Sequence, residues 1–264
     1  MNNLTRRDIL KVGGGLAALT LASSYGLADI YIDNRIAEIE ERKKQELRRH
    51  IRGIRENMVT LETKFHYMIR YNEISGLDED TTSGEGLFFG DYILTANHVV
   101  NVTKKSIIMK LGLENKFPYF NPENFFFDKI NEEVKIGEEI LEGIVHNPDK
   151  DLAIIPYKRK NKPKYEVKLG NSNKMDLLDE TFLVGAPLSK YQVVKRELIG
   201  SEVKKSEIIT PTRAIFGDSG SPLINNNGEV IAIASEIIPG SHAIFIPINE
   251  YREEIEKYEK TIRK

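Results

Sequence analysis

The sequence predicts an all-β fold for most of the chain, with a long exposed helix before it and a short helix after it. After residue 60, short runs of β-branched and aromatic residues are separated by Gly, Asn, Asp and Pro, a pattern typical of β-sandwiches and barrels. The segments on either side are instead rich in Glu, Lys and Arg around isolated apolar residues, which favours helix. A chain of 264 residues can bury the core of one domain of about 200 residues or of two small lobes.

Residues 1–28 combine paired arginines with an uncharged stretch. Arg6 and Arg7 precede a run from Val12 to Ala28 that is rich in Gly, Ala and Leu. The pattern resembles a twin-arginine export signal and predicts cleavage after Ala28. A retained membrane anchor is the alternative, because the run is close to the shortest that spans a bilayer. Both interpretations predict an exported protein, either periplasmic, extracellular or anchored to the outer face of the plasma membrane; a chance apolar N-terminus on a cytosolic protein is the third.

Residues 29–58 are predicted to form an exposed, charged helix. The segment from Ile32 to about Met58 has one Gly and no Pro, and apolar residues from Leu47 to Met68 recur at steps of four and three, the spacing of a coiled-coil seam. Self-association through this helix is one interpretation. The others are a helix lying on its own domain, or a helix that ends near Met58 before a strand at residues 65–70. The basic run at 42–55 would contact anionic lipid or face solvent.

The remainder, residues 59–264, is expected to be one catalytic domain. Its strands are expected among the apolar runs at residues 86–95, 106–111, 152–157, 181–184 and 229–234. Residues 117–133 contain two prolines and five phenylalanines and suggest a long loop packed by its own aromatic side chains. The alternation of Glu and Lys around Ile and Tyr from Tyr251 to Lys264 predicts a closing helix.

Composition excludes several classes of function. The 38 basic and 40 acidic residues nearly balance, so nucleic acid is not an expected partner. Cysteine is absent, which leaves covalent catalysis to Ser, Thr, Lys or a carboxylate. His66, His146 and His242 lack metal-ligand spacing, and neither a metal nor a cofactor is predicted.

The segment Gly217-Asp218-Ser219-Gly220-Ser221-Pro222-Leu223 precedes the apolar run at 230–234. Glycines beside a serine allow a tight turn that exposes the hydroxyl, and the amides of Gly217 and Ser219 can then converge on a developing oxyanion. This segment closely resembles the nucleophile loop of chymotrypsin-like serine proteases.

Two upstream segments resemble the other catalytic motifs of that family. Residues 90–100 form a strand pattern that ends in His98, like the general-base segment, and residues 149–155 resemble the strand that carries the orienting acid. Asp151 is preferred to Asp149 because it directly precedes the apolar run. The order His, Asp, Ser matches this family and differs from that of subtilisins and α/β-hydrolases. The resemblance therefore implies a catalytic triad of His98, Asp151 and Ser219.

The resemblance covers roughly residues 60–248 and implies two antiparallel six-stranded barrels with the active site between them. Barrel one would span about 59–160, barrel two about 165–248, and the C-terminal helix 249–264. The implied function is a serine endopeptidase that acts on polypeptides. The rival is a catalytically silent barrel that works as a membrane-tethered binding or scaffold protein.

The nucleophile loop departs from the family pattern. In relatives with Asp at the position of Asp218, that acid pairs with a new N-terminal amine after activation cleavage, but no convincing activation segment precedes residue 86. Asp218 therefore needs another cation, or the loop is ordered differently. Ser221, where many relatives have Gly, resembles the glutamyl-specific branch of the family. The segment from Tyr92 to Val100, the absence of Cys and the export signal instead resemble periplasmic stress proteases, without their C-terminal peptide-binding module.

The substrate pocket is predicted from three positions that resemble those of trypsin-like relatives. Arg213 lies six residues before Ser219, on the expected pocket floor, while Ser235 is on the wall and His242 is on the next segment. A carboxylate would complement this set, so cleavage after Glu or Asp is predicted. In the alternative, Arg213 faces solvent or pairs with an acid such as Glu236, and the pocket is shallow and apolar.

Overall fold

The computed structural model describes residues 27–71, 74–104, 107–108, 121–161, 163–185, 193–200, 207–211, 217–238 and 242–262. The paired arginines Arg6 and Arg7 and the pocket residue Arg213 lie outside this part of the chain. Contacts divide the chain into two units, residues 1–52 and 53–264, and all the described strands belong to the second unit.

Helix α3 (Leu27–Arg55) confirms the predicted N-terminal helix. Most of its described side chains are exposed. Of the three interpretations, a helix that ends near Met58 before a strand is confirmed, because strand β1 begins at Met58 and carries Leu61, Phe65 and Met68. The coiled-coil spacing therefore does not continue as a helix beyond Met58. Leu61 and Phe65, both fully buried, are an even number of residues apart, so they share a strand face as well as a helical stripe. Among the described helices, none is both long and apolar enough to cross a membrane.

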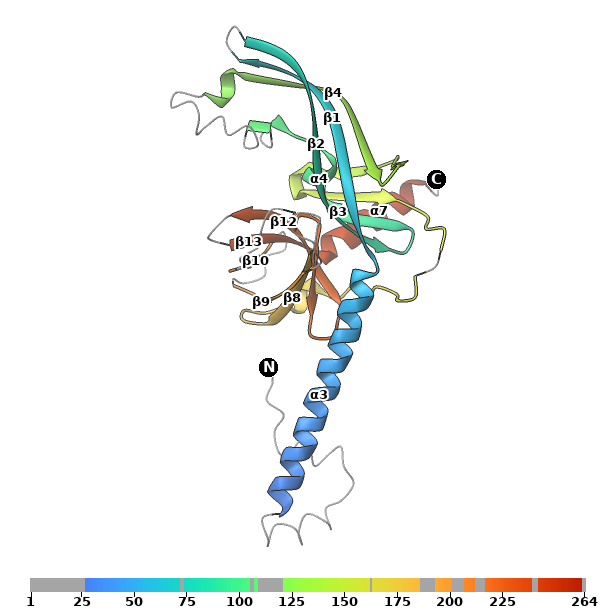
Figure 1. Ribbon diagram of the computed structural model, residues 1–264, viewed down its shortest axis with the longest axis vertical. Coiled ribbons are helices and arrows are strands. Elements are labelled where there is room, and N and C mark those ends of the chain that lie inside the picture. The colour runs from blue at the N-terminus through green and yellow to red at the C-terminus, as the bar shows by residue number, and fades with distance from the viewer. Residues whose placement is uncertain are drawn as a thin grey trace. The chain divides into compact units, whose positions relative to one another are not determined.

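The first sheet contains the longest of the described strands. Its described strands are β1 (Met58–Tyr71), β2 (Ile74–Phe89), β3 (Tyr92–Ala96), β4 (Phe125–Ile136), β5 (Glu139–Ile140), β6 (Val145–Asn147) and β7 (Leu152–Pro156). They are paired antiparallel in the order β5-β4-β1-β2-β3-β7-β6. Figure 1 shows β1, β2 and β4 curving side by side. Alternation along β1 and β4 buries Phe65, Tyr67 and Phe125 on one face.

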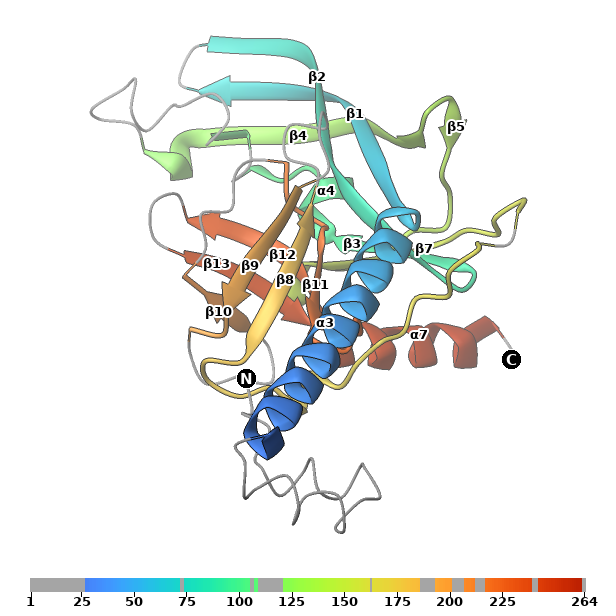
Figure 2. The same ribbon diagram turned by 60° about the horizontal axis from the view of Figure 1, so that its bottom comes forward.

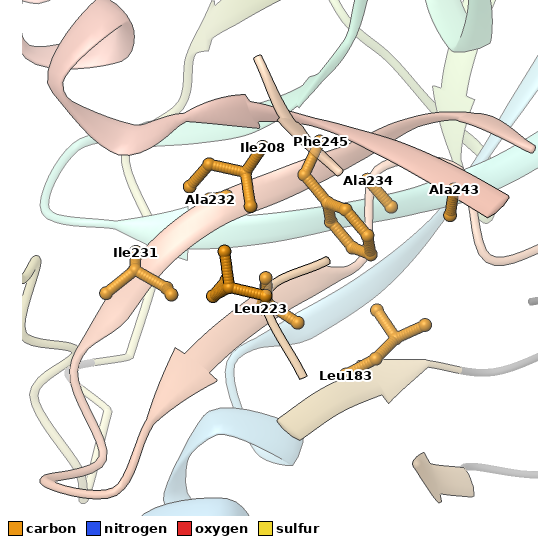
Figure 3. Packing of buried hydrophobic residues seen from close by; sticks show 9 residues of the cluster. Leu183, Ile208, Leu223, Ile231, Ala232, Ala234, Ala243 and Phe245 are labelled. Atoms are coloured by element: carbon orange, nitrogen blue, oxygen red, sulfur yellow. The ribbon is translucent and has the colours of Figure 1, made fainter. Parts of the chain in front are cut away.

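The second sheet contains strands β8 (Glu180–Gly185), β9 (Val193–Leu198), β10 (Ile208–Thr210), β11 (Pro222–Asn225), β12 (Val230–Ile238) and β13 (His242–Pro247). Its antiparallel order is β10-β13-β12-β11-β8-β9, and it is best seen in Figure 2. Leu183, Leu223, Ile231 and Phe245 lie in the apolar cluster on its inner face (Figure 3). The nine buried residues of this cluster come from six segments of the sheet and its connections, so the curl of the sheet surrounds its own core.

Short helices connect the strands, and a final helix closes the chain. They are α4 (Asn97–Val100), the 3₁₀ turns η2 (Pro122–Asn124), η3 (Pro148–Lys150) and η4 (Ser172–Lys174), and α7 (Ile248–Ile262). Tyr251 of α7 is fully buried, and its hydroxyl donates to the carbonyl oxygen of Thr95 at 2.8 Å. This contact attaches α7, which directly follows the second sheet, to strand β3 of the first.

The predicted class, mostly β with two curled antiparallel sheets between an N-terminal and a C-terminal helix, is confirmed. Three details differ. The first sheet has seven described strands rather than six. The aromatic segment predicted as a loop is largely strand β4, whose Phe125 and Phe127 pack inward while Phe126 is exposed. Ile107 and Ile108, predicted in a strand, are helical. Residues 125–136 form strand β4 because they pair with β1. The apolar content of this segment alone does not predict a strand.

Candidate active site

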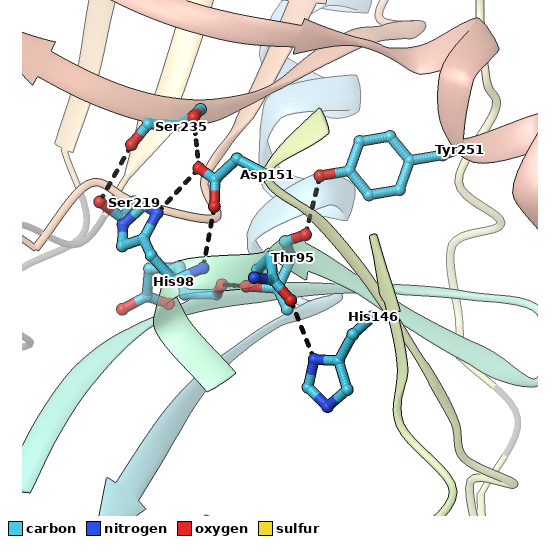
Figure 4. Close-up of polar contacts among 9 residues, drawn as sticks. Thr95, His98, His146, Asp151, Ser219, Ser235 and Tyr251 are labelled. Carbon is cyan, nitrogen blue, oxygen red and sulfur yellow. Dashed lines mark hydrogen bonds and ion pairs between the residues drawn. The ribbon is translucent and has the colours of Figure 1, made fainter. Parts of the chain in front are cut away.

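Strand pairing in the first sheet brings His98 and Asp151 together. Antiparallel pairing places Ala96 at the end of β3 opposite Leu152 at the start of β7. His98 follows the first of these residues and Asp151 immediately precedes the second. Their side chains meet with His98 Nδ1 2.8 Å from Asp151 Oδ2 (Figure 4).

Several hydrogen bonds hold Asp151 in place. Its Oδ1 accepts from the backbone amide of His98 at 2.9 Å, and its carbonyl oxygen accepts from the amide of Asn97 at 2.8 Å. Its backbone has φ 49°, in the left-handed region that non-glycine residues rarely occupy. Burial alone would raise the pKa of Asp151, but hydrogen bonds and charge from His98, with a hydrogen bond from Ser235, hold it below its ordinary value. Asp151 is therefore ionised near neutral pH.

Ser235 on β12 links this pair to Ser219. Its hydroxyl donates to Asp151 Oδ2, and its carbonyl oxygen accepts from the Ser219 hydroxyl at 3.4 Å. Figure 4 shows the chain of contacts from Ser219 through Ser235 to Asp151 and His98. Among the described contacts, the partner of the Ser219 hydroxyl is this carbonyl rather than the His98 ring.

The loop that carries Ser219 is tightly turned and is attached to both sheets. Gly217 and Gly220 have φ values of 101° and 85°, a region that favours glycine. The amide of Gly220 donates to Ala234 O on β12, and the amide of Glu85 on β2 donates to Ser219 O, each at 2.8 Å. A Cβ atom at position 220 would lie 1.7 Å from Glu85 O, so the loop approaches β2 more closely than any other residue type permits.

Two ionisable side chains, Asp218 and Glu85, are buried beside this loop. Asp218 is fully buried, and its Oδ2 forms an ion pair with Lys195 Nζ on β9. Glu85 is 2% exposed and accepts a hydrogen bond from the Thr60 hydroxyl at 3.3 Å. Burial raises the pKa of Glu85 to about 8. The hydrogen bond from Thr60 lowers this pKa in part, and the charge of Asp218 adds a smaller rise. Near neutral pH the Glu85 carboxyl is therefore mostly protonated.

The other residues that were predicted for the site lie on different elements of the fold. Ser235 contacts Asp151 and Ser219 as described above. His242 begins β13, where it pairs with Ile238. The competing acid Asp149 is exposed on η3, and the structure records no contact between it and His98.

Lys195 and Glu85 were missed by the sequence analysis. Lys195 stands out only as a charged residue at an inward-facing position of strand β9. Which positions face inward is known only once the strand register is known.

Comparison with known proteins gives matching results. A family model described as "Trypsin-like peptidase domain" matches residues 77–233. A protein of Pseudomonas putida named "Probable periplasmic serine endoprotease DegP-like" is 27% identical over 157 residues, which are 57% of this chain and 28% of that protein. One of the same name from Chlamydia pneumoniae is 29% identical over 158 residues, covering 57% and 27%. The chain thus spans less than a third of the length of these curated relatives.

Solved structures share the fold. The HtrA-type protease AlgW with a decapeptide has a TM-score of 0.55 and 17% identity over 80% of this chain and 66% of that one. A variant of the same protease with a decapeptide has a TM-score of 0.59 and 16% identity, with 81% and 67% covered. The family match extends over more than half of the chain and contains His98, Asp151 and Ser219. The chain therefore belongs to the family of proteins with a trypsin-like peptidase domain.

Proposed function

We propose that this protein is a serine endopeptidase that cleaves polypeptides through an acyl-enzyme on Ser219. The observation that carries the proposal is the bond between His98 Nδ1 and Asp151, next to the glycine-flanked Ser219 loop. With Nδ1 engaged, the other ring nitrogen, Nε2, is the one that can accept a proton. The family membership and the serine endoprotease names of the relatives support the same activity.

In the proposed mechanism, His98 removes the Ser219 proton while Ser219 Oγ attacks the substrate carbonyl carbon. Asp151 holds the imidazole tautomer and stabilises the imidazolium, and His98 then passes the proton to the leaving amine. Water hydrolyses the acyl-enzyme with His98 acting again as base. The amides of Gly217 and Ser219 are the proposed donors to the tetrahedral oxyanion.

This mechanism requires one rearrangement. The Ser219 hydroxyl, which donates to Ser235 O, must rotate about its Cα–Cβ bond to donate to His98. The 3.4 Å separation marks a weak hydrogen bond, and catalytic hydrogen bonds commonly become well aligned only when substrate binds. A permanently misdirected hydroxyl would instead favour the silent scaffold protein.

Labelling with a fluorophosphonate, which reacts with activated serines, separates these two functions. We expect wild-type protein to be labelled and Ser219→Ala and His98→Ala to lose labelling and peptidase activity, because triad members act as a unit. Ser221→Ala is the matched control, two residues along the same loop; it removes a buried hydroxyl that has no hydrogen-bond partner among the described residues. Folded wild-type protein that is never labelled would contradict the peptidase proposal and support the scaffold function.

We also propose that the protein is exported. The support is the paired Arg6 and Arg7 before an uncharged run, together with the periplasmic names of the relatives. Replacement of both arginines by lysine should leave the protein in the cytoplasm. Unchanged fractionation would refute a twin-arginine route, and detergent-dependent extraction of the wild type would identify a retained anchor.

Specificity for Glu or Asp before the cut stays a proposal based on Arg213, Ser235 and His242. Digestion of a peptide library by wild type and by Arg213→Ala tests it. An acidic preference that is lost in the variant supports it, whereas a preference for Val, Ala or Leu in both proteins rules it out.

A further inference from the structure

Lys195 occupies an unusual position for a lysine, on the core side of a strand. It pairs with Leu183 on β8, and Leu183 pairs with Leu223 on β11. Residues directly opposite each other in antiparallel strands project from the same face, and both leucines are fully buried in the apolar cluster. The next residue, Arg196, projects from the other face and its side chain is 68% exposed.

The ion pair with Asp218 explains how the core face accommodates this cation. Only 18% of the Lys195 side chain is exposed and none of Asp218. A charge in such a place is costly unless an opposite charge and hydrogen bonds compensate it. The fold also leaves room for the pair, because a Cβ atom at Gly185, at the end of β8, would lie 2.4 Å from Asp218 Oδ1.

Asp218 stands between the two residues whose amides are the proposed oxyanion donors. Its carbonyl oxygen accepts from the amide of Ser221 at 2.9 Å, and its side chain is held by Lys195. Fixing the side chain and the carbonyl of one residue restricts the peptide planes on both sides of it. The orientation of the Gly217–Ser219 turn therefore depends on the partner of Asp218.

We propose that Lys195 is a positioning residue that holds the Ser219 loop in its catalytic form, so that this peptidase needs no activation cleavage. The inference rests on the proposed function. A newly formed N-terminal amine could contribute no more than the ammonium group that β9 already supplies to Asp218. The cation is part of the chain, so the loop is ordered as soon as the second sheet folds.

Steady-state kinetics on a peptide substrate and the rate of fluorophosphonate labelling test this role. Lys195→Met should lower kcat and the labelling rate by about 10²-fold, the loss typical of an oxyanion donor, with a much smaller change in KM. Lys195→Arg keeps the cation and should restore the rate towards wild type. Arg196→Met is the matched control, since it removes the same charge from the neighbouring position on the exposed face, and it should retain wild-type kinetics.

A second variant covers loss of folding. Lys195→Met leaves Asp218 buried without this cation, which is strongly destabilising, whereas the double variant Lys195→Met with Asp218→Asn removes both charges. The double variant should fold, as judged by circular dichroism, and show the same loss of kcat. A folded double variant with wild-type kcat would overturn the inference.

Intact-mass measurement completes the test. The labelled wild-type species should have the mass of the purified chain plus the phosphonyl group that remains after fluoride leaves the probe, because no internal cleavage is needed. Labelling confined to a shortened chain with a new N-terminus inside residues 53–264 would overturn the inference and leave the proposed function standing. A folded wild type that is never labelled would overturn both.

Discussion

The two halves of the candidate site are held by different interactions. His98 lies just after strand β3 and Asp151 just before strand β7, and these two strands are paired. Hydrogen bonds from backbone amides reinforce the contact between the two residues. The Ser219 loop instead turns through two glycines with positive φ and is held by a buried ion pair and by hydrogen bonds to both sheets. Sheet pairing thus orders the proposed base and acid, while the proposed nucleophile depends on side chains and on the space around glycines. Substitutions in the two halves should therefore affect activity and stability differently.

The largest expected effect is on the half that strand pairing holds. Asp151→Asn should lower kcat by about 10⁴-fold, because an amide no longer selects the imidazole tautomer that leaves Nε2 as the base. The fold should survive, since the backbone contact from Asn97 to residue 151 remains. The measurement is kcat together with the thermal midpoint. A loss below tenfold would exclude Asp151 as the orienting acid.

The second prediction concerns the loop that carries Ser219. Gly220→Ala adds a Cβ atom 1.7 Å from Glu85 O at a residue with φ 85°, so the loop must move or the protein must unfold, at a cost of about 3 kcal/mol or more. We expect loss of labelling and a lower urea midpoint. Gly76→Ala, where a Cβ atom would meet nothing within 4 Å, is the control. Normal activity of Gly220→Ala would show that the loop adapts freely.

A third prediction concerns pH and the carboxyl of Glu85 behind the loop. Its pKa is raised to about 8 in the folded protein from an ordinary 4.5, so between these values the folded state holds a proton that the unfolded state has lost. The free energy of unfolding should therefore fall as pH rises through this range, by about 1.4 kcal/mol per pH unit from this group.

Urea unfolding at pH 5 and pH 7 isolates the contribution of Glu85. Glu85→Gln cannot ionise, so its free energy of unfolding should fall by about 2–3 kcal/mol less than that of the wild type over this interval. Glu79→Gln is the comparison on the same strand, where the carboxyl is exposed and its pKa is lowered by a hydrogen bond from Lys64. Parallel pH dependence in wild type and Glu85→Gln would contradict the buried-carboxyl interpretation.

The smallest expected effect concerns Ser235, which connects the two halves. Ser235→Ala removes the hydroxyl that donates to Asp151 but keeps the carbonyl that accepts from Ser219. Because His98 still supplies two hydrogen bonds to Asp151, we expect about a tenfold loss in kcat, the equivalent of one hydrogen bond to a charged group. A library digest of the same variant tests the pocket prediction separately: a changed preference would support a role of Ser235 in the pocket wall.

The elements that the sequence predicted correctly have strong local signals. The N-terminal helix, the C-terminal helix and the strands near residues 152 and 230 all have clear composition or periodicity. The aromatic segment that forms β4 lacks such a signal, because a bulge at Ile130 and charged residues interrupt its alternation of apolar and polar residues. It becomes a strand only through its pairing with β1. The end of α3 is ambiguous in the sequence for a different reason, since Leu61 and Phe65 satisfy both the helical and the strand spacing.

By itself, the sequence determined the mainly β class, the residues His98, Asp151 and Ser219 as candidates, and the need of Asp218 for a cation. These depend on residue type, order and spacing along the chain. Tertiary structure alone decided that Lys195 is that cation, that Glu85 lies behind the loop, and that Ser235 joins the two halves. Lys195 is 23 residues from Asp218 in the chain, and Ser235 is 84 from Asp151. The physical reason is that strand register determines which side chains face the interior, and a partner so far away in sequence leaves no local pattern.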